Sequence, residues 1–132
     1  MKIAPDTNVL LRDVLQDDPF QSRLATKALG NAYLVAISTP VFCEFVWVLR
    51  QLYKRSCSEV AEAIRYLIDS ENVTTDRAAV EAGLTLLDQG GDFADGVIAY
   101  EGHWLGAEEF VSFDKQAVAF VRAQGRKSRL LS

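Results

Sequence analysis

Four acidic residues of this sequence occupy positions where several carboxylates could act together. Asp6 follows a short apolar run, and Asp114 follows the apolar run VSF. Asp95 stands three residues after Asp92 in the segment GGDFADGVIAY, and Glu44 lies inside the apolar segment VFCEFVWVLR. Carboxylates gathered in one cleft cannot all ionise without cations, so the pattern favours a hard divalent cation such as Mg²⁺. Such a site suits phosphodiester hydrolysis, in which the metal activates water and offsets charge on the phosphate.

Glu44 has the least ordinary position of the four. Three apolar residues fall at helical spacing from it, namely Val41, Val48 and Leu52. This spacing predicts that Glu44 shares the stripe that faces the core, where an ionised carboxylate costs several kcal/mol unless it is paired or bound to a metal. The structural alternative is an ion pair with Arg12 or Arg50.

Each aspartate also has a structural explanation. Asp6, Asp92 and Asp114 all precede predicted helices, where Asp is a common N-cap. Asp95 takes the position of the acid in a capping box, but Asp is shorter than the preferred Glu or Gln. The alternatives therefore remain open for each position taken alone.

Alternating strand and helix patterns position these acids. Strands are predicted over 3–5, 33–37, around 73, over 110–113 and over 130–131. Helices are predicted over 7–15, 20–29, 40–53, 58–69, 76–87, 92–105 and 114–123. Alternation of this kind implies a parallel sheet with helices on both faces, and ligands bind such sheets at the carboxyl ends of the strands. Asp6 and Asp114 each end a predicted strand.

Length and composition are those of one folded domain over residues 1–132. The chain has 49% hydrophobic and 24% charged residues, which excludes a disordered or low-complexity chain. The net charge of −4 argues against nucleic-acid binding through diffuse charge, although residues 115–132 hold five basic side chains and no acid. No signal peptide, membrane span or paired-Cys spacing is found, so we expect a cytoplasmic protein with reduced Cys43 and Cys57 and no membrane partner.

At the acidic residues the chain resembles the PIN-domain family, and within it the toxin ribonucleases of VapBC-type toxin–antitoxin pairs. The resemblance rests on DTNVL at 6–10, VFCEFVWVLR around Glu44, DFADGVIA at 92–99 and SFDK at 112–115. It implies a three-layer α/β/α domain with a central, mainly parallel sheet of four to five strands. It further implies a Mg²⁺- or Mn²⁺-dependent endoribonuclease that forms homodimers and is blocked by a VapB-like antitoxin.

The resemblance also assigns roles by position. The family's four catalytic and metal-binding acids match Asp6, Glu44, Asp95 and Asp114. Asp92 matches a further acid that is often present in this subgroup, and Thr7, Asn8 and Ser112 match supporting polar positions. Asp6 and Asp95 are expected to be the chief metal ligands, while Glu44 and Asp114 orient waters or a second metal ion. RNA is the expected substrate, cleaved by metal-activated water without a side-chain nucleophile.

Three departures from the family pattern are modest. Pro5 stands where an aliphatic residue is usual, Gly96 replaces the usual Ala, and Ser112 replaces Thr. None of them removes a carboxylate, so we expect an active enzyme. Gly96 is expected to loosen the start of its helix.

Other functions fit the sequence less well. A haloacid-dehalogenase-like phosphatase needs a second acid two residues after the first, where this chain has Asn8, and a receiver domain needs an Asp where the middle strand ends in Ser38. No Ser stands in a nucleophile elbow, and the only histidine, His103, is interpreted as structural. Trp47 is interpreted as a core or dimer contact. A PIN nuclease outside toxin–antitoxin systems and an inactive interaction module remain the alternatives.

Overall fold

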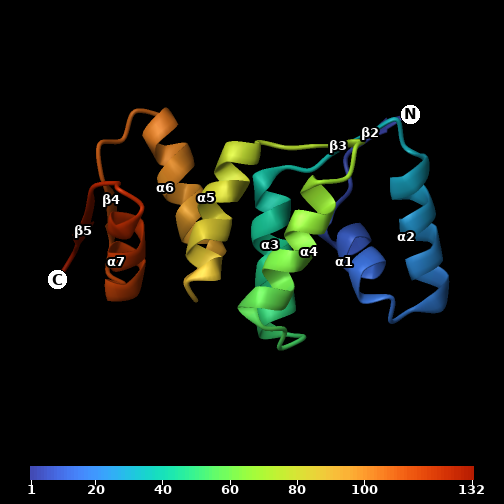
Figure 1. The fold of residues 1–132 in the computed structure, drawn as a ribbon, viewed down its shortest axis with the longest axis horizontal. Coiled ribbons are helices and arrows are strands. Elements are labelled where there is room, and N and C mark those ends of the chain that lie inside the picture. Colours follow the sequence, from blue (N-terminus) through green and yellow to red (C-terminus); the bar gives the residue numbers. More distant parts are fainter. The chain divides into compact units, whose positions relative to one another are not determined.

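Strands and helices alternate along the chain, as the sequence predicts. The structure, a computed structural model, describes residues 1–132 and divides the chain into two units, Met1–Arg77 and Ala78–Ser132 (Figure 1). Unit 1 holds β1 (Lys2–Ile3), α1 (Thr7–Leu15), α2 (Pro19–Asn31), β2 (Leu34–Ala36), α3 (Thr39–Gln51), α4 (Cys57–Ile68) and β3 (Val73–Thr74). Helix α5 (Arg77–Asp88) begins at the last residue of unit 1. Unit 2 then holds the rest of α5, followed by α6 (Phe93–Trp104), β4 (Phe110–Ser112), α7 (Lys115–Ala123) and β5 (Ser128–Leu130).

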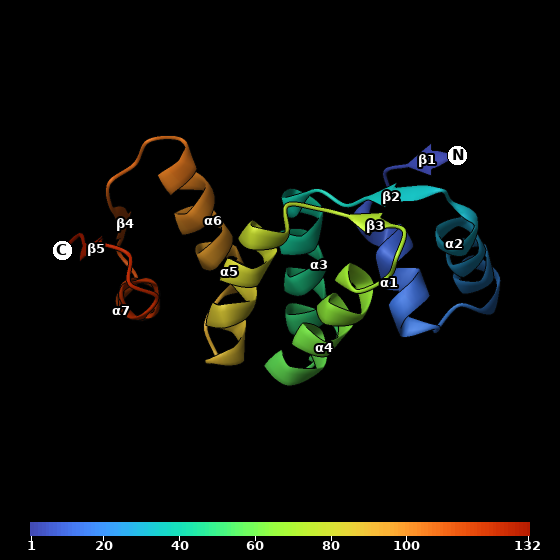
Figure 2. The ribbon, with the colours of Figure 1, turned by 45° about the horizontal axis from the view of Figure 1, so that its top comes forward.

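The sheet of unit 1 is parallel and has three strands in the order β1-β2-β3 (Figure 2). The predicted middle strand is the central one, with Val35 paired to Ile3 on one side and to Val73 on the other. Because β1 and β2 run parallel, their carboxyl ends lie at the same edge of the sheet. Asp6 and the start of α3 follow at that edge.

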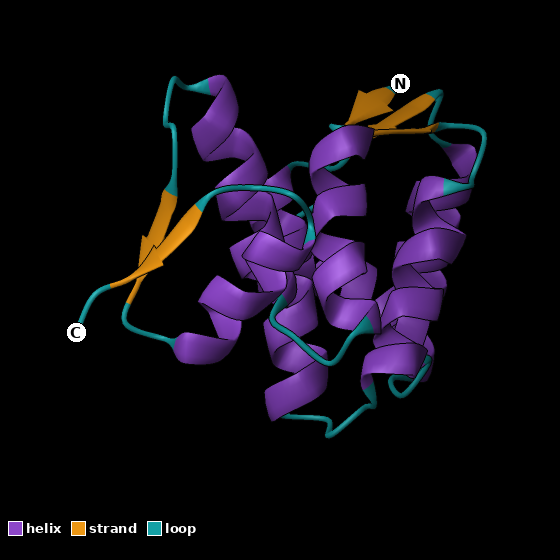
Figure 3. Cartoon of the chain, turned by 60° about the vertical axis from the view of Figure 1, so that its left-hand side comes forward, coloured by secondary structure: helices purple, strands orange, loops and turns teal.

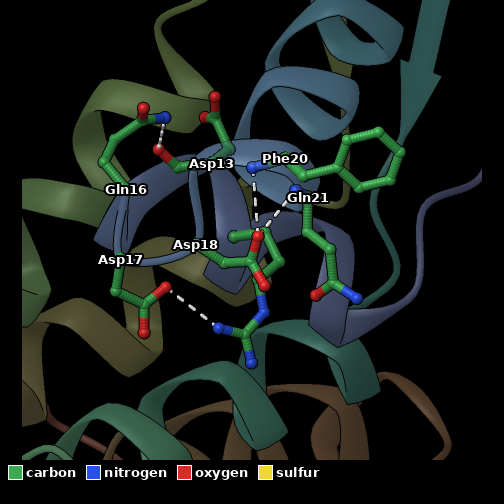
Figure 4. Close-up of polar contacts among 7 residues, drawn as sticks. Asp13, Gln16, Asp17, Asp18, Phe20 and Gln21 are labelled. Atoms are coloured by element: carbon green, nitrogen blue, oxygen red, sulfur yellow. Dashed lines mark hydrogen bonds and ion pairs between the residues drawn. The ribbon is translucent and has the colours of Figure 1, made fainter.

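Helix α1 is held by its two ends and by its neighbour α2. Gln16 ends α1 in the left-handed conformation (φ 53°), and its side-chain amide donates to the Asp13 carbonyl at 2.8 Å. Asp18 then caps α2 by accepting bonds from the backbone N–H groups of Phe20 and Gln21 (Figure 4). The turn is further fixed by an ion pair at 2.9 Å between Asp17 and the Arg12 guanidinium.

The core of unit 1 is made by one face of each helix and by the middle strand. On α3 the buried residues are Phe42, Phe45, Val46 and Leu49. On α4 they are Val60, Ala61, Ile64, Leu67 and Ile68, and α4 begins with a capping box between Ser56 and Glu59. The hydrogen bonds of this capping box lower the pKa of Glu59, which has an exposed carboxylate.

Unit 2 consists of three helices and a two-stranded parallel ladder, β4–β5 (Figure 3). Phe110 pairs with Ser128 and Ser112 with Leu130. Asp114 follows the carboxyl end of β4. The Ser128 hydroxyl is buried and donates to the Val118 carbonyl of α7 at 2.7 Å.

Two glycines let α5 and α6 approach closely. A Cβ on Gly96 would overlap the carbonyl oxygen of Ala82, and a Cβ on Gly83 would lie 2.6 Å from the Phe93 ring. The same Ala82 carbonyl accepts a hydrogen bond from the Gln124 amide at 2.8 Å. The expected loosening at Gly96 is therefore wrong: this glycine permits the tight contact that fixes the start of α6.

The α/β class and the parallel pairing are confirmed, with one correction. The predicted single sheet of four to five strands is found as two ladders, of three and two strands, one in each unit. The strands are short: Pro5, which lacks a backbone donor, stands two residues after β1, and the helix caps Ser38 and Asp114 stand two residues after β2 and β4. No helix of the chain combines the length and apolar character needed to cross a membrane.

Candidate functional site

Asp95 lies in the first turn of α6 and is half-buried. Its carboxylate has neither a hydrogen-bond donor nor a cationic partner, and the capping box with Asp92, the structural alternative for Asp95, does not form. Burial, followed by repulsion from Asp92 and then from Asp114, raises the pKa of Asp95 to about 6. Asp92 and Asp114 are therefore close enough to Asp95 to oppose its charge.

Asp92 and Asp114 each hold the start of a helix. Asp92 accepts a hydrogen bond from the Ala94 N–H at 3.0 Å. Asp114 accepts from Gln116 at 2.8 Å and from Ala117 at 3.3 Å, while the Ser112 hydroxyl accepts from the Asp114 backbone N–H at 3.0 Å. Only Oδ1 of each aspartate takes part, so the capping bonds orient both carboxylates and leave Oδ2 for a ligand.

In unit 1, Asp6 caps a helix as Asp92 and Asp114 do in unit 2. It is exposed, caps α1 through a hydrogen bond of 3.2 Å from the Val9 N–H to Oδ1, and follows the carboxyl end of β1. The two neighbouring polar residues differ: Thr7 is buried, whereas Asn8 is exposed. The capping explanation of Asp6, Asp92 and Asp114 is thus correct, and it leaves a ligand oxygen on each.

Glu44 does not lie where the spacing argument put it. It is exposed, and the buried face of α3 is formed by Phe42, Phe45, Val46 and Leu49. The alternative ion pair is also absent, since Arg12 binds Asp17 and the Arg50 guanidinium donates to the Arg55 carbonyl. The misassignment arose because α3 is apolar around most of its circumference, so its sequence does not single out one buried face. Glu44 remains an accessible carboxylate in the second turn of α3.

The acids of unit 2 have the chemistry that a divalent cation requires. Asp92, Asp95 and Asp114 form no ion pair with Lys or Arg, and each offers at least one carboxylate oxygen. Oxygen ligands with unneutralised charge suit Mg²⁺ or Mn²⁺, which keep several waters and need few protein ligands. No group of three Asp, Glu, His or Cys side chains lies close enough to enclose a metal ion.

Sequence reasoning missed the two residues that position Asp92 and Asp95. Gly83 and Gly96 set the distance between α5 and α6, and hence where the first turn of α6 lies. A glycine inside each of two consecutive helices, in the middle of α5 and in the first turn of α6, was the available signal, because glycine weakens a helix unless close packing requires it.

The sequence also suggested interpretations of His103, Trp47 and the two cysteines. His103 is exposed and contacts the Trp104 ring edge-on, so it is not part of a core. Trp47 is 58% exposed, which excludes the core interpretation and leaves that of a contact. Cys43 and Cys57 form no disulfide.

Comparison of the sequence with models of known protein families finds a match to the PIN domain. The model of the PIN domain matches residues 3–123, a span that includes Asp6, Glu44, Asp92, Asp95 and Asp114. No curated protein and no solved structure gave a significant match. Because the matched residues make up nearly the whole of both units, the chain belongs to the PIN domain family.

Proposed function

We propose that this protein is a Mg²⁺- or Mn²⁺-dependent endoribonuclease that works as a single domain. PIN domains are in general metal-dependent nucleases, and a nucleic acid is their substrate. The observation that carries the proposal is Asp95: a half-buried, unpartnered carboxylate beside two further acids, with its pKa raised to about 6. Such a charge arrangement is costly without a cation and is typical of functional sites.

We assign the ligand roles to the acids that the sequence singles out. Asp6 and Asp95 would be the chief ligands, Glu44 and Asp114 would complete the set, and Asp92 would assist. A divalent cation held there would activate water and offset the negative charge of the phosphate. Thr7, Asn8 and Ser112 would support these acids; Ser112 already accepts the backbone N–H of Asp114.

Within each unit, the protein's own contribution is to hold each carboxylate in place on its helix before a cation binds. Asp6, Asp92 and Asp114 are fixed by backbone N–H groups at three helix starts. Asp95 is fixed by the close packing of α6 on α5. Preorganised oxygen ligands lose little freedom on binding, which favours both the cation and the phosphate it attracts.

Titration calorimetry on the metal-free protein tests the ligand assignment. We expect Mg²⁺ or Mn²⁺ to bind, and the affinity to fall in the Asp6→Asn and Asp95→Asn variants. Glu62→Gln, which removes an exposed acid of α4, is the matched control and should bind as the parent does. Unchanged affinity in all four single amide variants of Asp6, Glu44, Asp95 and Asp114 would contradict the assignment.

We further propose that the nuclease is the toxin of a VapBC-type pair in the cytoplasm. An Arg or Lys of a VapB-like antitoxin could enter among the carboxylates and replace the charge of the cation. Expression from the native operon should yield a complex of this chain with the product of the neighbouring reading frame. If that frame is unrelated to antitoxins and the chain purifies alone without toxicity, the toxin proposal is wrong and the nuclease proposal stands.

We also propose a homodimer. The support is Trp47, which is 58% exposed on α3 and is a residue type enriched at protein interfaces. Light scattering should give twice the mass of the chain, and a monomer at all concentrations would exclude the dimer.

A further inference from the structure

The last turn of α6 carries a tryptophan that is both exposed and held in place. Trp104 is 72% exposed. Its ring lies 6.4 Å from that of Tyr100 at 57° and 5.9 Å from that of His103 at 78°. Two neighbouring rings therefore restrict the tryptophan while most of its surface remains in solvent.

Cationic side chains border these rings. The Arg126 guanidinium lies 5.3 Å from the centroid of Tyr100, a cation–π contact. Arg126 and Lys127 also line a pocket of about 490 Å³, together with His103. This volume is within the range of sites that hold small ligands.

The acids near this pocket do not cancel its positive charge. Glu108 and Glu109 line the pocket, but Glu109 is bound by Arg129 at 2.7 Å. Glu108 is the remaining acid of the lining, which also holds Arg126 and Lys127. With Arg129 counted, three cations stand against two acids, a local excess of one positive charge in a chain of net charge −4.

We propose that Trp104, Tyr100, Arg126 and Lys127 form an aromatic–basic platform that stacks unpaired bases of single-stranded RNA. Proteins that bind single strands combine aromatic rings for the bases with a positive surface for the backbone. The Arg126 guanidinium on the Tyr100 ring distinguishes this surface from an apolar protein contact. The inference rests on the proposed ribonuclease function and adds a second place where the substrate is held.

The platform is remote from the acids. Trp104 follows Asp95 by nine residues of helix, a rise of about 14 Å along α6. Asp92 and Asp95 lie at the N-terminal end of α6, whereas Tyr100 and Trp104 lie in its C-terminal half. Loss of the platform should therefore weaken RNA binding without removing the metal ligands.

Fluorescence of the full-length protein in EDTA tests the platform without cleavage. The chain has two tryptophans, so in the Trp47→Phe variant Trp104 is the only one. A short oligoadenylate should quench its fluorescence in a saturable manner, and inorganic polyphosphate should not. In the Trp104→Phe variant the remaining Trp47 should respond little, which makes it the matched control.

Affinity measurements identify the contribution of each side chain. Trp104→Ala should weaken oligoadenylate binding about 5- to 100-fold, and Trp104→Phe should retain most of the affinity. Arg126→Gln should weaken binding, whereas Arg23→Gln, which removes an exposed cation of α2, should not. Circular dichroism of each variant should match that of the parent, since the rings are exposed.

Two results would overturn the platform. One is that Trp104 fluorescence does not change when the oligonucleotide is added. The other is that Trp104 fluorescence changes with protein concentration alone, which would indicate a contact between copies of the chain. If the parent cleaves RNA with Mg²⁺ but Trp104→Ala binds RNA as the parent does, the platform is wrong and the nuclease stands. If Trp104 binds RNA but no cleavage occurs, the platform stands and the nuclease is wrong.

Discussion

The surroundings of Asp95 oppose its ionisation, and this one residue connects stability with function. Burial and the charges of Asp92 and Asp114 raise its pKa to about 6, above the ordinary value of an aspartate. The folded protein therefore binds the proton of Asp95 more tightly than the unfolded chain does. A carboxylate with this property destabilises the fold when it is ionised, and a bound cation would reverse that effect.

Replacing Asp95 by Asn should stabilise the metal-free protein at neutral pH. In the parent, the free energy of unfolding should fall as pH rises from about 4 to about 6, because the native state loses a proton that the unfolded chain has already lost. The half-exposed position reduces the effect through solvent screening to about 1–2 kcal/mol. Urea unfolding at pH 4, 5, 6 and 7 measures the free energy of unfolding of the parent and of Asp95→Asn.

Glu62→Gln is the control for this comparison, because it removes an exposed charge from unit 1, whereas the three acids belong to unit 2. It should follow the pH dependence of the parent. Parent and Asp95→Asn curves that run parallel from pH 4 to 7 would contradict the electrostatic account of Asp95.

Asp114 has a structural and a chemical role that two substitutions can separate. Asn can still accept the N–H groups of Gln116 and Ala117, so Asp114→Asn should keep the stability of α7. Asp114→Ala loses the cap and should be less stable by about 1 kcal/mol. Both variants should bind metal more weakly. Equal stability of the two variants in thermal unfolding would show that the cap contributes nothing.

At the residue scale the sequence predicted the aspartates better than the glutamate. The caps at Asp6, Asp92 and Asp114 follow from local chemistry, because a side chain that caps a helix needs only the next few residues. The exposure of Glu44 depends on which face of α3 is buried. That choice is made by packing, and an almost wholly apolar helix gives no local indication of it.

At the scale of elements, the contact between α5 and α6 places two of the acids. Gly96 lies against the backbone of Ala82 and Gly83 with no room for a methyl group. The Ala82 carbonyl is also held by Gln124, so the neighbour cannot move without losing that hydrogen bond. The position of Asp95, next to Gly96, depends on this contact.

Gly96→Ala should destabilise the protein by about 1–3 kcal/mol, as overpacking of a close contact does, although Ala is the better helix former. Gly102→Ala is the matched control in the same helix, because its Cβ would meet only the Ala107 methyl group, at 3.9 Å. That variant should be neutral or slightly more stable. Thermal unfolding compares the two, and a Gly96→Ala variant as stable as Gly102→Ala would contradict the close packing.

The sequence predicted the existence of every element and was less accurate about their ends. Helix α1 begins and ends where periodicity put it, because Asp6 caps it and a left-handed Gln16 follows. Helix α2 runs on to Asn31 through Gly30, where a stop was predicted. Glycine ends a helix only when the chain adopts a positive φ there, and Gly30 does not, whereas Gly90 has a φ of 87°.

At the scale of the whole molecule, an acidic chain is expected to act on a polyanion. A net charge of −4 repels RNA, so productive binding requires local positive charge. Much of the basic C-terminal segment is already engaged, since Arg122 donates to the Ser128 carbonyl and Arg129 binds Glu109. A cation at the acids, together with Arg126 and Lys127 of the proposed platform, would then supply the attraction. The separation of the acids between two units was beyond the sequence, which showed no linker or change in composition.

The most direct test of the account is single-turnover cleavage of RNA, measured with Mg²⁺ and with EDTA on the parent and on Asp95→Asn. The same Asp95→Asn sample is melted in parallel to show that it is folded. We predict that the parent cleaves RNA with Mg²⁺ and does not cleave it in EDTA. We predict that Asp95→Asn does not cleave RNA, although its unfolding temperature equals or exceeds that of the parent. Cleavage by Asp95→Asn at the parent's rate, or equally fast cleavage in EDTA, would contradict the metal-dependent mechanism.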